Sequence, residues 1–402
     1  MNTALPSCRF KRWGASYGLN LGVKKKMALR RPHGMPDHSI NVAIWSADWH
    51  GTNGQAIVTR HVVEGVKFVN WTFANYRVGH GRALSSVLRA TLIIWWALLY
   101  DQVQVVYLVC SRSTFGFFRD FPALGAVLLR RRVVIHCHGS DIIDLLSCRK
   151  VSFLARLIYK RCEIVVPAKH LVADLKQLGI LRINMCENFI VQHPKTTIDP
   201  TLQSGNKLLV VWNSNIMSSK GFFDTARAVE LAFARGVTIK LLSLGEPLSD
   251  NEMSAAEVRQ RLSALLDADW FDYRGTVSAD EAIAYTAKAD VVVLPSRYSS
   301  ECQPLSLIQA MCYGVDVIVA DTAALRDTVR DYPALILNNP TSENISNALE
   351  RLQMQKADNN NDTKEKRQIA ALRAQARFSK ERFDRQMFEI LRGSGNANEE
   401  NS

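Results

Sequence analysis

Residues 291–320 read VVVLPSRYSSECQPLSLIQAMCYGVDVIVA, and this stretch decides the fold of the chain. An apolar, β-branched run is followed by a polar loop, an amphipathic helix and, after Gly314, a second apolar run. This order predicts strand, loop, helix and strand, the repeating unit of a doubly wound parallel sheet. Such sheets bind ligands at the carboxyl ends of their strands. Glu301 in the loop and Gln309 in the helix could therefore grip hydroxyl groups while the helix N-terminus attracts phosphate, which suits a nucleotide-sugar.

Alternating strand and helix patterns extend from this stretch along the rest of the chain. Apolar runs predict strands at residues 40–46, 103–109, 132–139 and 164–167 in the first half, and at residues 207–215, 237–245 and directly before Gly275 in the second half. Helical periodicity fills most of the segments between them, and Ser278 with Glu281 forms a predicted capping box. The predicted fold class is therefore α/β, with two Rossmann-like doubly wound parallel-sheet domains.

The length of 402 residues exceeds one ordinary hydrophobic core, so we expect two domains. The expected parts are a disordered basic leader (1–38), an N-terminal domain (39–190), a linker (191–206), a C-terminal domain (207–378) and a disordered tail (393–402). A predicted helix at residues 379–392 presents Phe383, Met387 and Leu391 on one face, so it could pack back on the N-terminal domain. The cleft between the carboxyl edges of the two sheets is the expected place of a ligand site.

Charge and cysteine content limit the partners. The formal net charge is +12, with basic clusters at residues 24–26 and 130–132. Such clusters attract phosphates, anionic lipid or nucleic acid, or they form a solvated surface. Aromatic and basic residues are not interleaved as in single-strand binders, so nucleic acid is not an expected partner. Eight cysteines lack metal-ligand spacing, which predicts reduced thiols in a cytosolic protein.

The longest apolar run, ATLIIWWALLY at residues 90–100, is shorter than a bilayer span. It predicts a buried core helix, and an interfacial patch through Trp95 and Trp96 is the alternative. The leader lacks the continuous apolar segment of a secretory signal.

Motifs for several other chemistries are absent from the sequence. It contains no GxxxxGK[ST] phosphate loop, no GxGxxG after the first strand, and no HExxH or paired-cysteine motif. No DxD motif stands where a metal-dependent transferase would need it, and Glu301 has no carboxylate partner at hydrolase spacing. We therefore predict neither a metal nor a cofactor.

Two short segments complete the candidate site. Lys220 precedes Gly221 and a predicted helix, so its ammonium adds a full charge to the partial positive charge of the helix start and suits a diphosphate. His138 ends a predicted strand and precedes Gly139 and Ser140. Together with residues 301–314, these segments resemble the glycosyltransferase family 4 group of GT-B retaining enzymes. The resemblance covers nearly all of residues 40–392.

The resemblance implies roles for five side chains. Lys220 matches a lysine that contacts the donor diphosphate, and Glu301 matches the first acid of an E-x7-E pattern, which contacts the transferred sugar. Gln309 stands in place of the second acid, which holds the ribose hydroxyls; an amide can accept and donate hydrogen bonds but carries no charge. Asn215 stands where the family often has an arginine, which leaves one cation fewer beside the leaving group. His138 matches a histidine near the transferred sugar that helps to position the acceptor.

The resemblance also implies a set of loop contacts. Gly275, Thr276 and Val277 would hold the base through backbone groups, and backbone N–H groups of Cys302, Gln303 and Leu305 would bind phosphate or sugar. Asn53, Gly54 and Ser140 would form the loops that approach the acceptor or the donor phosphate.

The resulting expectation is sugar transfer, with retention at the anomeric carbon, from a nucleoside diphosphate donor to a hydroxyl of a glycan or lipid-linked glycan. The resemblance implies bacterial surface-polysaccharide biosynthesis in the cytoplasm, and the basic, tryptophan-containing first half could dock on the anionic inner face of the membrane. Gln309 and Asn215 motivate one alternative, a catalytically weak nucleotide-sugar-binding or partner protein. A UDP-sugar epimerase on the same fold is the other.

Overall fold

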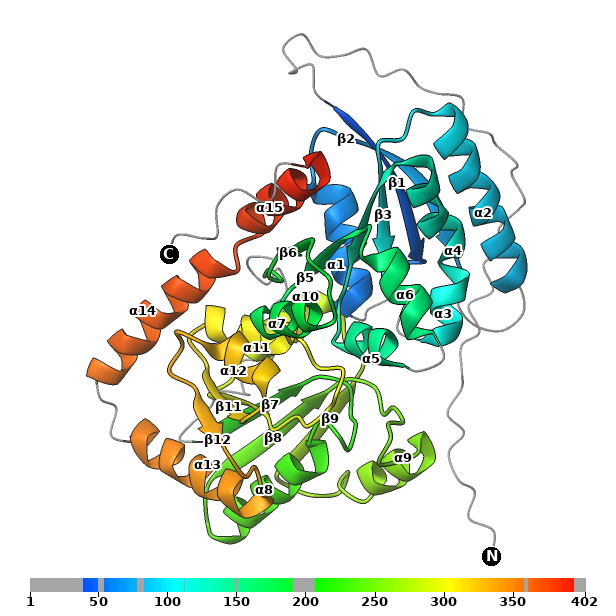
Figure 1. The fold of residues 1–402 in the computed structure, drawn as a ribbon. Helices are drawn as coiled ribbons and strands as arrows, with labels where there is room; N and C mark the ends of the chain where they lie inside the picture. The colour runs from blue at the N-terminus through cyan, green and yellow to red at the C-terminus, as the bar shows by residue number, and fades with distance from the viewer. Residues whose placement is uncertain are drawn as a thin grey trace, which may run out of the picture. The chain divides into compact units, whose positions relative to one another are not determined.

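The computed structural model contains two six-stranded sheets whose strands are all parallel (Figure 1). The structure describes residues 39–49, 54–77, 83–111, 113–148, 151–190, 207–357 and 361–393. The predicted leader, the predicted linker and all of the predicted tail except Gly393 lie outside these residues. By their contacts, residues 39–402 form a single unit that contains both sheets.

The first sheet has the strand order β2-β1-β3-β4-β5-β6. Its strands are β1 (Ile40–Ala47), β2 (Val69–Tyr76), β3 (Val105–Val109), β4 (Arg132–His136), β5 (Glu163–Val166) and β6 (Ile183–Met185). The sequence patterns did not predict β2, although it pairs with β1 over eight positions, from Ile40 with Val69 to Ala47 with Tyr76. This edge strand is only partly buried, so its segment, VNWTFANY, is not the continuous apolar run that marks the central strands.

Helices cover both faces of the first sheet. They are α1 (Gly54–Gly65), α2 (Ala83–Tyr100), α3 (Thr114–Arg119), α4 (Phe121–Leu124), the 3-10 helix η1 (Gly125–Leu129), α5 (Asp141–Ser147), α6 (Ser152–Tyr159) and α7 (Lys169–Gln177). One core cluster joins the sheet to α2, α5, α6 and α7, and another joins the opposite face to α1 and to the last helix, α15 (Lys380–Arg392).

The second sheet has the strand order β12-β11-β10-β7-β8-β9. Its strands are β7 (Leu208–Asn213), β8 (Ile239–Leu244), β9 (Phe271–Gly275), β10 (Val291–Leu294), β11 (Asp316–Ala320) and β12 (Leu335–Leu337). The chain builds outward from β7 in one direction through β8 and β9 and in the other through β10, β11 and β12. The strand order therefore reverses between β7 and β10, which is where doubly wound sheets form their ligand crevice.

The helices of the second half include several that the sequence patterns did not predict. They are α8 (Phe222–Ala234), α9 (Ala255–Ser263), α10 (Ala279–Ala287), α11 (Leu305–Cys312), α12 (Ala323–Val329), α13 (Ser342–Ala357) and α14 (Asn361–Arg377). The prediction of a polar interruption at residues 356–366 was wrong over most of its length, because α13 ends at Ala357 and α14 begins at Asn361. Both helices are rich in polar residues with good helix propensity, so apolar periodicity does not reveal them.

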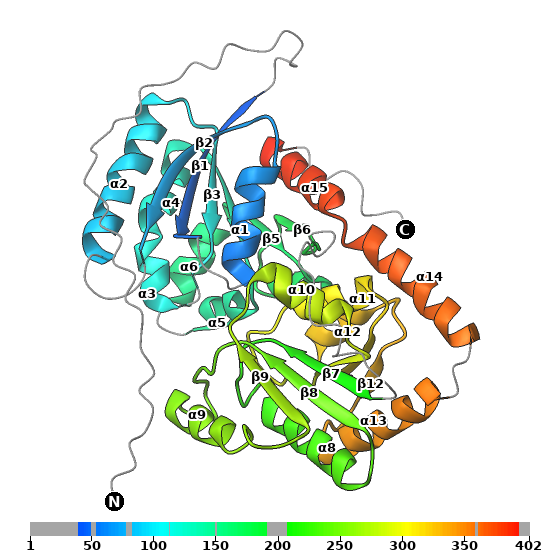
Figure 2. The same ribbon diagram turned by 180° about the vertical axis from the view of Figure 1, so that it is seen from behind.

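The chain returns to the first sheet at its C-terminal end, where α15 lies beside α1 (Figure 2). Phe383, Met387 and Leu391 are buried in the core of that sheet. Arg132 donates to the carbonyls of Ile390 and Leu391 at 2.7 and 2.8 Å, and so satisfies free acceptors at the helix end. Its side chain also forms two hydrogen bonds with the Glu163 carboxylate. Arg132, a member of the basic cluster 130–132, therefore stabilises the fold.

The apolar run 90–100 forms the second part of α2, and the prediction of a buried core helix was wrong for its outer side. The helix has 18 residues and is the one described helix with the length and composition to cross a membrane. Ala90, Ile94 and Ala97 are buried, whereas Leu92 and Trp96 are exposed.

A buried carboxylate, Glu187, connects the two halves just after β6. It accepts hydrogen bonds from Arg377 at 2.6 and 3.0 Å and from Arg330 at 3.2 Å. Gln303, which precedes α11, donates to the same oxygen at 3.3 Å and also accepts from the backbone N–H of Asn188 at 2.6 Å. Arg377 further donates to three backbone carbonyls of residues 327–330. These bonds join β6, the loop before α11, and the end of α14.

We expect Arg377→Met to lower the free energy of unfolding by about 3 kcal/mol, because it leaves the buried Glu187 carboxylate with fewer partners. The exposed pair of Arg227 and Glu230 provides the control, and Arg227→Met should cost less than about 1 kcal/mol. Urea unfolding followed by circular dichroism measures both variants. Equal losses in the two variants would contradict a special role for the Glu187 cluster.

Candidate functional site

Lys220 and Glu301 meet at the point where the strand order of the second sheet reverses. Lys220 follows β7 and Glu301 follows β10, and these two strands are neighbours. The Lys220 Nζ atom lies 3.2 Å from Glu301 Oε2, and the two side chains are only 15% and 11% exposed. The structure therefore brings together the two residues that the sequence placed on separate loops 81 positions apart.

Neighbouring hydroxyl groups and one glycine hold this ion pair in place. Lys220 Nζ donates to Ser214 Oγ at 3.1 Å, and Ser296 Oγ donates to Glu301 Oε2 at 3.1 Å. Gly221 has a φ of +81°, and a Cβ atom there would lie 2.6 Å from the ring of Pro295. Only glycine suits this position, because the lysine loop is pressed against the end of β10 in a left-handed conformation.

The helices that follow these two loops begin without side-chain caps. Neither α8, whose N-cap is Gly221, nor α11, whose N-cap is Pro304, has a side-chain cap hydrogen bond. In contrast, α9 has a complete capping box, and the box predicted for Ser278 and Glu281 at α10 is confirmed. The first N–H groups of a helix have no acceptor within the helix, so an anion beside Lys220 could use those of α8 and α11.

Gln309 lies on α11 with its side chain directed at the end of β7. Its Oε1 atom accepts a hydrogen bond of 2.8 Å from Asn213 Nδ2, which also donates to Thr286 Oγ1 at 3.0 Å. Among the described residues the Gln309 nitrogen makes no hydrogen bond, so it remains a donor for a ligand. The sequence did not predict Asn213 as a candidate site residue, since nothing in the pattern distinguished it from Asn215 two positions later.

Two other predicted donor-binding segments lie at the ends of neighbouring strands. A Cβ atom on Gly245, after β8, would lie 3.1 Å from the Cα atom of Asn215, so the loops after β7 and β8 touch. Gly275 ends β9 with a φ of +69°, and its carbonyl accepts from the Gly245 N–H at 2.8 Å. Thr276 and Val277 follow it. No bond joins this turn to Lys220 or Glu301 among the described residues, and its contact with a base remains a prediction.

The side chains just after Glu301 serve the contact with the first half. Cys302 is buried in the core cluster of the first sheet, and Gln303 is bonded to Asn188 and Glu187. The prediction for these residues and Leu305 concerned their backbone N–H groups, and it stays a prediction. Leu305 lies near the start of α1, because a Cβ atom on Gly54 would be 3.6 Å from its Cδ1 atom. Asn53 lies outside the described residues.

The turn after β4 carries His138 and touches the residues that precede Glu301. Ser140 Oγ donates to the carbonyl of Ser299, and Ser300 Oγ donates to the carboxylate of Asp141. A Cβ atom on Gly139 would lie 3.2 Å from the Ser300 carbonyl oxygen, so a larger residue would push these segments apart. The histidine turn and the glutamate loop are thus adjacent, as the site prediction required.

A second histidine, His136, lies beneath His138 in the core of the sheet. Their ring centroids are 4.3 Å apart, and His136 Nδ1 lies 2.6 Å from the Tyr107 hydroxyl. Burial lowers the pKa of His136 to about 3 and raises the pKa of Tyr107 well above its ordinary value. At neutral pH both groups are therefore uncharged, and one hydrogen bond joins the hydroxyl to Nδ1.

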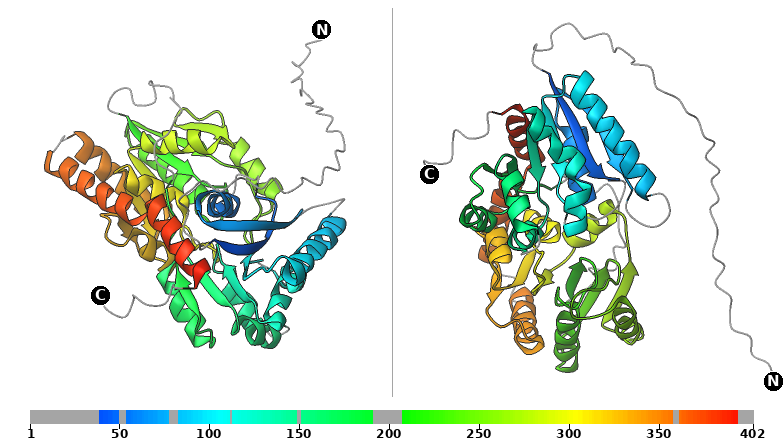
Figure 3. Two further views of the ribbon diagram at one scale, coloured as in Figure 1. Left: turned by 90° about the horizontal axis from the view of Figure 1, so that it is seen from above. Right: turned by 45° about the vertical axis from the view of Figure 1, so that its right-hand side comes forward.

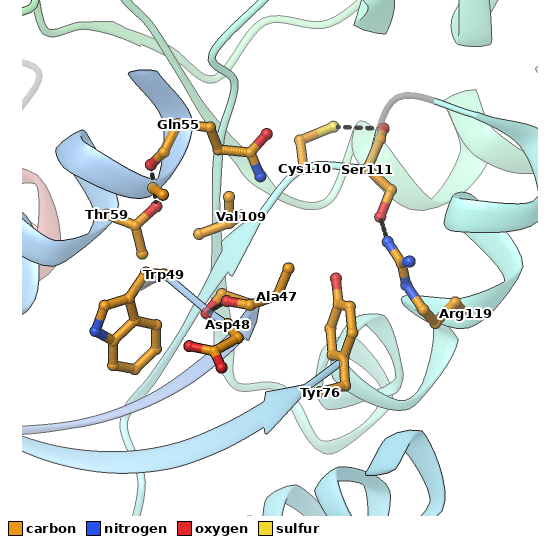
Figure 4. Close-up of a pocket in the computed structure, with 12 residues that line it drawn as sticks. Ala47, Asp48, Trp49, Gln55, Thr59, Tyr76, Val109, Cys110, Ser111 and Arg119 are labelled. Atoms are coloured by element: carbon orange, nitrogen blue, oxygen red, sulfur yellow. Dashed lines mark hydrogen bonds between the residues drawn. The ribbon is translucent and has the colours of Figure 1, made fainter. Parts of the chain in front are cut away.

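A cavity of about 330 Å³ opens at the carboxyl edge of the first sheet (Figure 4). It lies where the strand order of that sheet reverses, between β1 and β3. The lining combines aromatic, hydroxyl, amide and charged side chains: Ser46, Asp48, Trp49, Gln55, Thr59, Tyr76, Ser111 and Arg119. A smaller pocket shares Gln55, Cys110 and Ser111 with it and reaches His138 and Gly139. The cavity therefore adjoins the histidine turn.

Arg119 is held at one side of this cavity by fixed contacts. Its guanidinium lies 4.3 Å from the ring centroid of Tyr76 and donates to Ser111 Oγ. The buried Asp120 carboxyl lies 3.6 Å from Arg119 Nε and accepts from the Trp45 indole N–H at 3.0 Å. Burial raises the pKa of the Asp120 carboxyl above its ordinary value. Arg119 is thus a fixed donor for a ligand in the cavity.

The sequence patterns did not predict most of the residues of this cavity. Tyr76 was missed because β2 was not predicted, and Arg119 because it lies on a short helix with no recognisable motif. Within the described part of the chain, no three His, Cys, Asp or Glu side chains are grouped so as to hold a metal ion.

Comparison with known proteins agrees with this geometry. Residues 207–355 match the family model of glycosyl transferases group 1. The structure resembles sucrose-phosphate synthase from Thermosynechococcus elongatus over 88% of this chain and 98% of that one, with a TM-score of 0.63 and 15% identity. The fold is GT-B. Anabaena HepE, solved with UDP and glucose, has a TM-score of 0.66 and 15% identity over 88% of this chain and 99% of its own.

A third GT-B structure, α,α-trehalose 6-phosphate synthase from Burkholderia multivorans, has a TM-score of 0.65 and 11% identity over 89% of this chain and 97% of that one. A search of curated proteins found no match. The family model thus covers most of the second half of the chain, and the solved structures share the fold of both halves.

The burial of His136 predicts a pH dependence of stability. Its folded-state pKa lies below the unfolded value near 6.5, so the unfolded chain binds more protons between pH 3 and 6.5. The free energy of unfolding should therefore fall on acidification through this range, by as much as about 1.4 kcal/mol per pH unit from this group. In the His136→Gln variant, the free energy of unfolding should change less steeply with pH over this range.

Tyr107→Phe is the matched control, because it removes the hydrogen bond but leaves the histidine buried and the slope in place. Urea unfolding at several pH values gives the three slopes. Equal slopes for the unmodified chain and His136→Gln would contradict a buried neutral histidine.

Proposed function

We propose that the chain is a retaining glycosyltransferase that moves a sugar from a nucleoside diphosphate donor to a hydroxyl of a glycan or lipid-linked glycan. The observation that carries the proposal is the Lys220–Glu301 pair at the reversal point of the second sheet, next to the His138 turn of the first. In this proposal Lys220 is the cation beside the diphosphate, Glu301 binds the sugar and His138 acts on the acceptor side.

On the donor side, the main task is to stabilise the leaving nucleoside diphosphate. Lys220 and the uncapped N-terminus of α11 supply positive charge where the phosphate charge grows, and no metal is needed for that in this proposal. Glu301, held by Ser296, orients the sugar through its hydroxyls. Gln309 binds the ribose with its free amide nitrogen while its oxygen stays on Asn213.

Retention follows from a substitution on one face of the sugar. The acceptor hydroxyl attacks the anomeric carbon as the bond to the phosphate oxygen breaks, and that leaving oxygen takes the hydroxyl proton. His138 helps to hold the reacting groups in line, so the contribution of the protein is mainly orientation and charge.

The cavity beside His138 is the proposed acceptor site. Trp49 and Tyr76 offer aromatic surfaces for a sugar ring, and Gln55, Thr59 and Ser111 offer hydrogen-bonding groups for its hydroxyls. An acceptor of this kind fits surface-polysaccharide assembly in the cytoplasm, at the inner face of the membrane. Two proteins of similar structure support a sugar-transfer function. HepE was solved with UDP-glucose, and a Burkholderia xenovorans trehalose-phosphate synthase was solved with glucose-6-phosphate.

A panel of nucleoside diphosphate sugars, screened by thermal shift and then by donor consumption with and without glycan acceptors, tests the proposal. A bound donor raises the melting temperature, and transfer consumes it only when acceptor is present. Binding without turnover on any acceptor would instead indicate a nucleotide-sugar-binding protein. Conversion of the donor sugar without acceptor would indicate an epimerase.

Lys220→Ala should lower turnover by roughly 10²-fold or more, the scale expected for losing one group that stabilises a developing anion. Steady-state kinetics with saturating donor measures the effect. Lys176→Ala, which removes an exposed lysine of α7, is the control and should be neutral. Near-normal turnover of the Lys220 variant would remove the leaving-group argument.

Gln309→Glu should tighten binding of the nucleoside diphosphate by about five-fold. The carboxylate can still accept from Asn213, and it accepts from the ribose hydroxyls with the added strength of a charged acceptor, worth about 1 kcal/mol. Isothermal titration calorimetry measures the dissociation constant. A loss of affinity of ten-fold or more would mean that the ribose is held elsewhere.

A further inference from the structure

Helix α2 is apolar on both of its long faces. Its inner face packs on the first sheet, where Ala90, Ile94 and Ala97 are fully buried in the core. Its outer face, called here the α2 face, consists of side chains that are each 57–74% exposed: Leu84, Leu88, Leu92, Trp96, Leu99 and Tyr100. In both views of Figure 3, α2 lies along the outside of the first half.

The α2 face differs from the outer side of an ordinary surface helix. Such helices carry polar residues toward solvent, whereas a helix that is apolar all round is normally buried or in contact with lipid. From Leu84 to Tyr100 every fourth residue belongs to this set, with Leu99 beside Tyr100, so the exposed side chains form one stripe along a helix about 27 Å long. Arg89 is the one charged residue of α2. A continuous exposed apolar stripe of this kind marks an interaction site.

The inner packing of α2 determines how it could meet a membrane. The helix has the length and composition to span a bilayer, but a spanning position would remove Ala90, Ile94 and Ala97 from the core of the first sheet. It can therefore present only its outer face, with its axis along the membrane surface. Trp96 and Tyr100 lie at one end of the stripe with ring centroids 4.5 Å apart, and these residue types favour the interface between lipid and water.

Neighbouring elements add exposed apolar side chains beside the stripe. The short helix α4 packs against α2, and Trp95 closes this contact, since a Cβ atom on Gly125 would lie 3.0 Å from its ring. On either side of α4 in the sequence, Phe115 of α3 is 89% exposed and Leu128 of η1 is 83% exposed. Figures 1 and 2 both show α3 and α4 next to α2.

The surrounding charge favours an anionic partner. Residues 83–161 contain eleven Lys and Arg but only four Asp and Glu. Arg89 on α2 itself and Arg130 at the end of η1 are exposed in this segment. An anionic bilayer has an apolar acyl region for the stripe and negatively charged headgroups for the cations. Each cation near such a surface adds to the binding free energy.

We propose that the α2 face docks the chain on an anionic lipid bilayer, with Leu88, Leu92 and Trp96 inserted at the level of the acyl chains and the flanking cations on the headgroups. This docking is a property of the first half. It goes beyond the proposed sugar transfer and does not depend on it.

Sedimentation with sucrose-loaded vesicles tests the proposal without donor or acceptor. The full chain should bind vesicles that contain 30% phosphatidylglycerol in phosphatidylcholine, and bind less to pure phosphatidylcholine. Leu88→Glu/Leu92→Glu should weaken the partition at least about 100-fold, because two apolar side chains leave the bilayer and two negative charges approach it.

The matched control is Leu266→Glu/Leu372→Glu, which changes two leucines of similar exposure in the second half and should bind as the unmodified chain does. Circular dichroism melts establish that both variants fold. Equal vesicle binding by the α2 variant and the control would overturn the proposal. Failure of the unmodified chain to bind either kind of vesicle would also overturn it. If sedimentation velocity then showed a dimer of the unmodified chain and of the control but not of the α2 variant, the α2 face would be a contact between copies of the chain.

Discussion

The Glu187 carboxylate is the interaction on which the rest of the arrangement depends. It lies just beyond the last strand of the first sheet and accepts from Arg377, Arg330 and Gln303. Gln303 is only two residues from Glu301, so the position of the proposed catalytic loop relative to the first half is tied to this buried charge. A buried carboxylate needs several donors because its desolvation is costly, and here those donors come from segments far apart in the sequence.

In both sheets the candidate site lies where the strand order reverses. In the second sheet the order reverses between β7 and β10, and the loops after these strands bring Lys220 to Glu301. In the first sheet it reverses between β1 and β3, and the loops after these strands line the cavity beside Arg119. At such a point the helices on either side diverge, which leaves space at the strand ends. A lysine and a glutamate meet at one such point, and aromatic, hydroxyl and amide groups line a cavity at the other.

Sequence reasoning failed where local pattern and tertiary environment disagree. The edge strand β2 is too little buried to show an apolar run, and with it Tyr76 and the cavity were missed. The apolar run of α2 was expected to be core, because periodicity cannot distinguish a face that packs on a sheet from a face that meets another apolar partner. The stretch 356–366 was taken for an interruption because its helices are stabilised by propensity and tertiary contacts more than by an apolar face.

The sequence by itself determined the α/β class, most of the central strands, the start of α10 and the identity of Lys220, Glu301, Gln309 and His138 as site candidates. The strands, the helix start and Lys220 follow from short-range physics: β-branched runs, capping chemistry and the preference of phosphate for a cation at a helix start. The roles of His138 and of the pair Glu301 and Gln309 rest on the family resemblance. Only the tertiary structure decided the strand order, the Lys220–Glu301 contact, the bond from Asn213 to Gln309 and the cavity around Arg119. Each of these depends on which strand ends lie next to one another, and that is decided by packing between segments that are distant along the chain.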